Sequence, residues 1–160
     1  MVIAGCQSPG SQGVGSSATK RKAAKPSVRG VVCLFDHRPW LNADAAGDRD
    51  PEGIRFRVFL DSESVKGVLR EGTFHVELYQ IGRRADGEME RTLVSDWHYP
   101  TSRFSVVSAK ILGMGYHLQL RWARKDIAGH EIELITQFED RGGNITRSGT
   151  KRLRVPKYVS

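Results

Sequence analysis

Apolar residues alternate with polar ones in several short segments between Val31 and Val155. A side-chain period of two is typical of β-strands with one buried face, and no segment shows the period of an amphipathic helix. The clearest apolar sets are Ile54, Phe56, Val58 and Leu60; Phe74, Val76 and Leu78; Tyr116, Leu118, Leu120 and Trp122; Ile132, Leu134, Thr136 and Phe138; and Leu153 with Val155. We expect these sets to face a core, and their neighbours, such as Phe59, His75 and His117, to face outward.

Turn-forming residues separate the strand segments. Gly82 to Gly87 and Asp140 to Asn144 are rich in Gly, Asp and Asn, which favours hairpin turns because these residues tolerate positive φ. Two less regular apolar runs, Val31 to Phe35 and Thr92 to Trp97, bring the total to about seven predicted strands. Pro100 to Gly115 is the least regular connection, and we expect a short helical turn in it.

This spacing of strands predicts an all-β fold, an antiparallel two-sheet sandwich of the immunoglobulin or fibronectin type III kind over residues 27–156. A small β-barrel is the alternative. The chain of 160 residues has the usual length for one domain. We expect Trp122, and by preference also Trp97, to belong to the core, because large aromatic side chains bury the most apolar surface; partial exposure of Trp97 as an aromatic contact surface is the alternative.

The N-terminal segment has a different composition. Ile3-Ala4-Gly5-Cys6 resembles a bacterial lipobox, which implies lipidation of Cys6 after signal-peptide cleavage. The basic and apolar parts of such a signal peptide are then expected upstream of Met1. The rest of residues 1–26 is rich in Gly and Ser and then in Lys and Arg, which predicts a disordered linker. Gln7 after the cysteine implies, by the same resemblance, an outer-membrane address.

The two cysteines, Cys6 and Cys33, lie in different contexts. Three interpretations are open: a lipidated Cys6 with Cys33 as a buried thiol, a disulfide between them, or two free thiols. The first fits best, because Cys33 lies inside an apolar run and Cys6 follows small residues.

Three short motifs are similar to segments of uncharacterised lipoproteins of the planctomycete type. They are Asn42 to Gly53 followed by Ile54-Arg-Phe-Arg-Val, then Gly72-Thr-Phe-His-Val-Glu-Leu, then Leu112-Gly-Met-Gly-Tyr. The resemblance implies a cell-envelope location and an immunoglobulin-like sandwich, and it supplies no catalytic residue.

The net charge of +7 is unevenly distributed. All 18 acidic residues lie between Asp36 and Asp140, together with 14 basic ones, so that this part carries 14 − 18 = −4. The excess of Lys and Arg lies at both ends, which favours an anionic neighbour or simple solubilisation. The candidate anion-binding residues are Arg147, Lys151, Arg152 and Arg154, of which Arg152 and Arg154 share one strand face.

The segment from Asn42 to Gly53 concentrates carboxylates as calcium-binding loops do. The candidate ligands are Asp44, Asp48, Asp50 and Glu52. Ala46 stands where such a loop needs a ligand, and Glu52 comes one position early for the closing ligand, so a solvated acidic loop is the favoured interpretation.

No residue pattern indicates catalysis. The five histidines lack metal-ligand spacing, and neither a nucleophile elbow nor a dinucleotide fingerprint is present. We therefore expect a non-enzyme without cofactor: a lipid-anchored binding or structural module of the cell envelope, on the outer membrane or its periplasmic face, with a protein or polysaccharide partner. A module that binds nucleic acid or an acidic polymer through its basic ends is the alternative.

Overall fold

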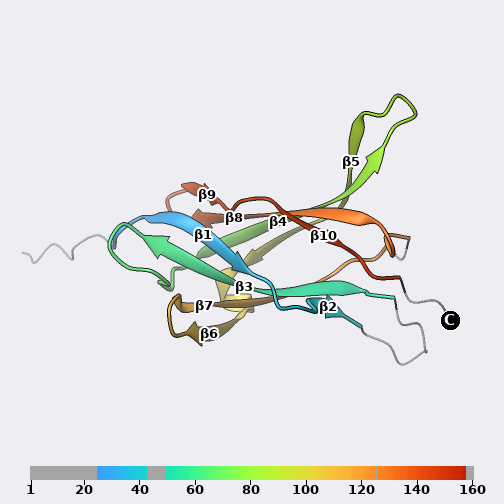
Figure 1. Ribbon diagram of the computed structural model, residues 1–160. Helices are drawn as coiled ribbons and strands as arrows, with labels where there is room; N and C mark the ends of the chain where they lie inside the picture. Colours follow the sequence, from blue (N-terminus) through green and yellow to red (C-terminus); the bar gives the residue numbers. More distant parts are fainter. Residues whose placement is uncertain (1–24, 43–49, 125, 158–160) are drawn as a thin grey trace, which may run out of the picture.

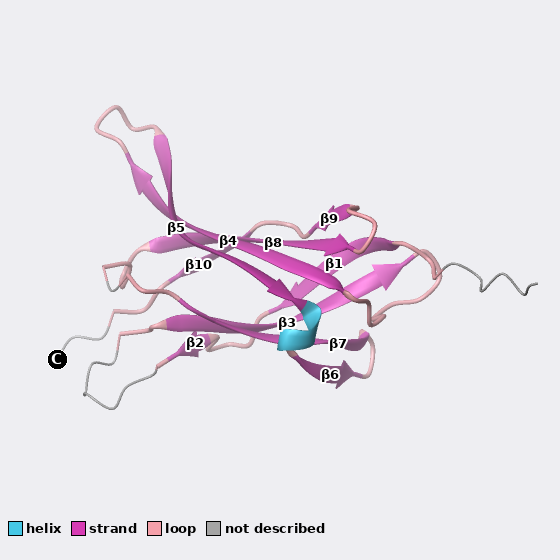
Figure 2. Cartoon of the chain, turned by 180° about the vertical axis from the view of Figure 1, so that it is seen from behind, coloured by secondary structure: helices cyan, strands magenta, loops and turns pink. Residues whose placement is uncertain are grey.

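The computed structural model describes residues 25–42, 50–124 and 126–157, and shows two antiparallel sheets packed face to face (Figures 1 and 2). The first sheet has the order β1-β3-β7-β6, with β2 also paired to β3. Its strands are β1 (Val28–Leu34), β2 (Trp40–Leu41), β3 (Gly53–Ser62), β6 (Ser105–Ala109) and β7 (Gly113–Arg121). The second sheet has the order β10-β8-β4-β5, with β9 also paired to β8. Its strands are β4 (Gly72–Arg83), β5 (Met89–Pro100), β8 (Glu131–Asp140), β9 (Ile145–Arg147) and β10 (Lys151–Arg154).

The strand order is that of an immunoglobulin-type sandwich. In the usual lettering the sheets are A-B-E-D and G-F-C-C′, with β5 in the position of C′. The chain changes sheets between β5 and β6 through a 3₁₀ helix at Thr101–Arg103. The predicted sandwich and the predicted helical turn are therefore both confirmed.

The core lies between the two sheets and is built by the predicted apolar sets. Ile54, Phe74, Leu118 and Phe138, from four different strands, are each 1% exposed or less. Trp97 and Trp122 are also buried, and Trp40 packs against the core from the side. The alternation of apolar and polar residues thus identified the inward faces correctly.

The structure adds strands to the predicted set. β6 lies in the segment Pro100 to Gly115, where we expected an irregular connection. It is an edge strand that pairs with β7 alone, so most of its residues stay exposed and its sequence lacks an apolar alternation. β2 and β9 are only 2 and 3 residues long and are equally hard to recognise from sequence.

Phe59 lies on the outer side of the first sheet, as expected, but its side chain is fully buried and not exposed. Its cross-strand partner in β7 is Gly115, and a Cβ atom added there would lie 2.6 Å from the Phe59 ring. The missing side chain of Gly115 makes room for the ring, so an aromatic residue is buried on the outer side of the first sheet.

Tyr116 fixes the loop between β3 and β4. Its hydroxyl accepts a hydrogen bond from the Arg70 amide (2.9 Å) and donates one to the Arg70 carbonyl (2.7 Å). The same loop touches the β6–β7 hairpin, where the Met114 amide donates to the Gly67 carbonyl at 3.0 Å. Gly67 and Gly113 both have positive φ, and a Cβ atom on Gly67 would lie only 1.8 Å from the Leu112 carbonyl oxygen. The two loops therefore contact each other at one end of the sandwich.

Candidate functional site

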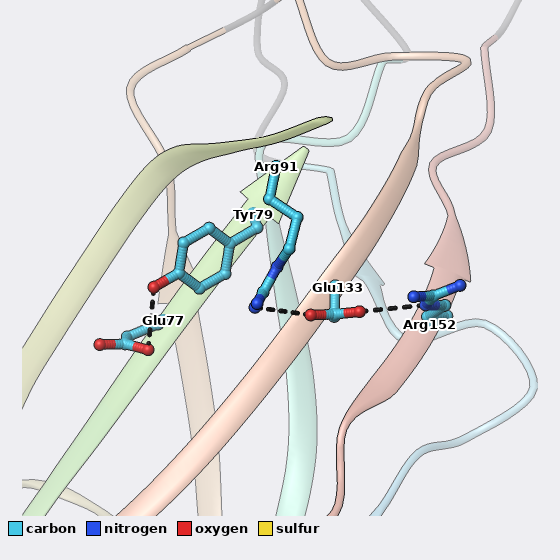
Figure 3. Close-up of polar contacts among 5 residues, drawn as sticks. All are labelled: Glu77, Tyr79, Arg91, Glu133 and Arg152. Atoms are coloured by element: carbon cyan, nitrogen blue, oxygen red, sulfur yellow. Dashed lines mark hydrogen bonds and ion pairs between the residues drawn. The ribbon is translucent and has the colours of Figure 1, made fainter. Parts of the chain in front are cut away.

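The outer face of the second sheet carries a network of polar side chains (Figure 3). Alternate residues of β8, such as Glu131, Glu133 and Gln137, point outward because their neighbours fill the core. Antiparallel pairing places Glu133 between Tyr79 of β4 and Arg152 of β10. The face is therefore assembled from strands that are distant in sequence.

Glu133 is the centre of this network. Its side chain is only 6% exposed, and each carboxylate oxygen meets one guanidinium group. Arg91 Nη2 lies 2.6 Å from Oε1, and Arg152 Nε lies 3.0 Å from Oε2 (Figure 3). Charge-assisted bonds of this kind satisfy a carboxylate that has lost most of its water.

Tyr79 joins the network through its ring and its hydroxyl. The guanidinium carbon of Arg91 lies 4.3 Å from the ring centroid, in a cation–π contact. The hydroxyl donates to Glu77 Oε2 at 3.1 Å (Figure 3). Desolvation raises the pKa of Tyr79, and the hydrogen bond to Glu77 raises it further, since both favour the neutral phenol. Arg91 is thus held between a carboxylate and an aromatic ring.

A β-bulge brings Arg91 to this face. Leu78 pairs with Ser95, whereas the next residue, Tyr79, pairs with Leu93, so that β5 has one extra residue. Beyond the bulge the odd-numbered residues of β5 point outward, which places Met89, Arg91 and Leu93 in one row.

The row on β5 is apolar at both ends. Met89 and Leu93 are each 50% exposed, and Arg91 stands between them. The β4–β5 hairpin that carries the row projects beyond the body of the sandwich (Figures 1 and 2). We call the surface formed by Tyr79, Met89, Arg91, Leu93 and Arg152 the hairpin face.

A second polar group lies near the other end of β4. His75 Nε2 is 2.9 Å from Glu139 Oε2, and His98 Nε2 is 3.4 Å from Asp96 Oδ2. The two imidazole rings lie side by side, with centroids 4.3 Å apart. Within the described ranges no three His, Cys, Asp or Glu side chains gather as metal ligands would.

The structure brings together three of the four candidate anion-binding residues. Arg147, Arg152 and Arg154 face outward on the second sheet, opposite Gln137, Glu133 and Glu131 respectively. Arg152 is engaged by Glu133, and Arg154 Nε donates to the Gly129 carbonyl at 3.3 Å. Lys151 points to the other side of β10, where its amino group lies 5.6 Å from the Phe35 ring centroid.

The acidic loop and the lipobox lie mostly outside the described residues. Asp44, Asp48 and Cys6 belong to that part, so the expected solvated acidic loop and the lipidation of Cys6 stay predictions. Glu52, at the end of the acidic loop, lies 3.6 Å from Arg121.

Within the described part of the chain, the thiol of Cys33 forms no disulfide. The side chain packs against the core from β1, and burial raises its pKa, which hydrogen bonds with Thr136 and Ser148 partly offset. A thiol in this state is a poor nucleophile.

Among the described residues no helix is both long and apolar enough to span a bilayer.

Sequence reasoning did not find the network around Glu133. Alternation puts Tyr79 and Glu133 on outward faces, but it does not say which strands are neighbours. The outward position of Arg91 is even harder to predict, because the bulge that turns it outward leaves no pattern in the sequence.

No protein-family model matches the chain, and a comparison with curated proteins also gives no match. Among solved structures, the chain is similar to MtrC from Shewanella baltica OS185, with a TM-score of 0.46 and 8% identity over 79% of this chain and 22% of that one. It is also similar to Spo0M, a sporulation control protein from Bacillus subtilis, with a TM-score of 0.44 and 9% identity over 82% of this chain and 51% of that one. The chain thus spans about a fifth and about half of these proteins, and similarities of this size carry no functional argument.

Proposed function

We propose that the chain is a non-catalytic binding module of the cell envelope, tethered through Cys6, whose hairpin face contacts a protein partner. The observation that carries the proposal is the exposure of Met89 and Leu93 on either side of Arg91. The side chain of Arg91 is already held in place by Glu133 and by the ring of Tyr79. Methionine, arginine and aromatic residues are enriched in the centres of protein interfaces. Side chains ordered before binding also lose less entropy in the complex.

A protein fits this face better than a polysaccharide. Sugar rings stack on open aromatic faces, but the guanidinium of Arg91 already lies over the ring of Tyr79. The projecting hairpin also offers two half-exposed apolar side chains, Met89 and Leu93, which a protein groove can bury. The tether itself rests on the lipobox-like motif before Cys6 and on the resemblance to envelope lipoproteins.

Photo-crosslinking in the native host tests the hairpin face. With a photoreactive amino acid at position 93 of the full chain, we expect a covalent adduct with one protein species, and we expect Arg91→Glu to abolish it. The same probe at position 119 is the matched control, because Gln119 is exposed on the outer face of the opposite sheet. Adducts that are equal at both positions, or absent at position 93, would contradict the proposal.

Phase partitioning tests the tether. We expect the full-length gene product to enter the detergent phase after a high-salt wash, which removes proteins held by surface charge alone. The Cys6→Ala variant should stay in the aqueous phase, because it lacks the thiol that receives lipid. Identical partitioning of the two proteins would exclude Cys6 as the anchor.

A further inference from the structure

The end of the sandwich where β1 begins has the features of a membrane-contacting surface. The β3–β4 loop and the β6–β7 hairpin touch there through the bond between Met114 and Gly67. The chain enters the domain at the same end, because Val28 pairs with Ser62 and Arg70 donates to the Pro26 carbonyl at 3.4 Å (Figure 1).

Half of the large apolar side chains exposed in the described residues lie on these two loops. Ile111, at the tip of the β6–β7 hairpin, is 84% exposed, and Val65 in the β3–β4 loop is 53% exposed. Leu69 and Met114 are the other two, at 37% and 39%. Apolar side chains gathered at one end of a domain mark a contact with another phase or molecule.

The charges at this end favour an anionic neighbour. Lys66 and Lys110 flank the exposed Val65 and Ile111 in sequence, and neither makes an ion pair within the described ranges. Two carboxylates of the same end are paired with arginines, Glu63 with Arg29 and Glu71 with Arg141, and the carboxylate of Asp61 accepts a hydrogen bond from the Gly67 amide at 3.0 Å. The basic residues Lys20, Arg21, Lys22 and Lys25 precede Pro26 in the sequence.

We propose that this end, formed by Val65, Lys66, Leu69, Lys110, Ile111 and Met114, docks directly on an anionic lipid surface. Apolar tips enter the boundary between headgroups and acyl chains, while lysines contact the headgroups, as in other interfacial proteins. The close contact between the two loops at Gly67 restricts their backbones before binding, so less entropy is lost on insertion.

Docking at this end gives the hairpin face a defined orientation. β4 runs from Gly72, beside the docking end, to Arg83 at the far hairpin, a strand length of roughly 35 Å. The hairpin with Met89 and Leu93 therefore points away from the lipid surface (Figures 1 and 2). The inference goes beyond the proposed tether, because the docking end is expected to act in protein that carries no lipid.

Vesicle co-sedimentation tests the proposal with the full chain carrying Cys6→Ser, which cannot be lipidated. We expect binding to vesicles that contain phosphatidylglycerol and none to pure phosphatidylcholine, with a decrease as salt is raised. The double variant Val65→Asp/Ile111→Asp should lower the partition coefficient about tenfold or more, because two apolar side chains no longer enter the bilayer. Lys66→Ser/Lys110→Ser should weaken the preference for anionic lipid.

Gln119→Asp is the control for added charge and should bind vesicles as the parent does, because Gln119 lies on the outer face of the first sheet. Thermal melts check that every variant is folded. The proposal is overturned if the parent does not bind, if Val65→Asp/Ile111→Asp binds equally well, or if neutralising Lys20 to Lys25 alone abolishes binding. A dimer that Ile111→Asp dissociates, without vesicle binding, would assign the surface to a second copy of the chain. None of these outcomes affects the crosslinking at position 93 or the partitioning of Cys6→Ala.

Discussion

Replacing Trp122 by alanine is expected to lower the free energy of unfolding by about 3–5 kcal/mol, the range for large aromatic side chains in a core. The side chain is 5% exposed, and its indole nitrogen donates to the Pro51 carbonyl at 3.2 Å. The substitution leaves a cavity next to β7 and also leaves that carbonyl without its partner. Denaturation in urea measures the loss.

His117→Ala is the control for this prediction. His117 lies in the same stretch of chain but on the outer face of the first sheet, where it is half-buried, so we expect a loss below about 1 kcal/mol. Similar losses for Trp122→Ala and His117→Ala would mean that the inner and outer faces of β7 are assigned wrongly.

Removing both cationic partners of Glu133 should be almost as damaging. The variant Arg91→Met/Arg152→Met leaves a carboxylate that is 6% exposed without a counter-charge, and we expect a loss of about 3 kcal/mol. Adding Glu133→Leu removes the unpaired buried charge, and the stability of the triple variant should return to within about 1 kcal/mol of that of the parent. Both are measured by urea denaturation at neutral pH.

An exposed pair of arginines provides the matched control. Arg29 and Arg141 also meet carboxylates, but Glu63 and Glu71 are 61% and 72% exposed and remain hydrated without them. Arg29→Met/Arg141→Met should therefore cost less than about 1 kcal/mol. If this variant and Arg91→Met/Arg152→Met lost the same stability, Glu133 would not depend on its arginines.

The alternative of an anion-binding module is less well supported by the arrangement of its residues. Arg152 already pairs with Glu133, and Lys151 lies on the opposite side of β10 from Arg147 and Arg154. A polyanion would have to compete with Glu133 for Arg152, and it would have to pass Glu131 and Glu139.

Alternation of apolar and polar residues was sufficient to predict the sandwich and its core. Burial of one strand face requires a period of two, which survives in a single sequence because it involves only near neighbours. The sets that contain Phe56, Leu78 and Leu134 are therefore found without knowledge of their partners. The hairpin turns are equally local, since Gly87 and Gly143 are needed for their own positive φ.

Strand neighbours and register were decided by the tertiary structure alone. The ion pairs of Glu133 with Arg91 and Arg152 need β5, β8 and β10 in one sheet, and they need the bulge at Val94 to turn Arg91 outward. The burial of Phe59 needs Gly115 on the neighbouring strand. Such contacts join residues far apart in the chain, so their energy depends on how whole strands pair, and no short segment of sequence contains that information.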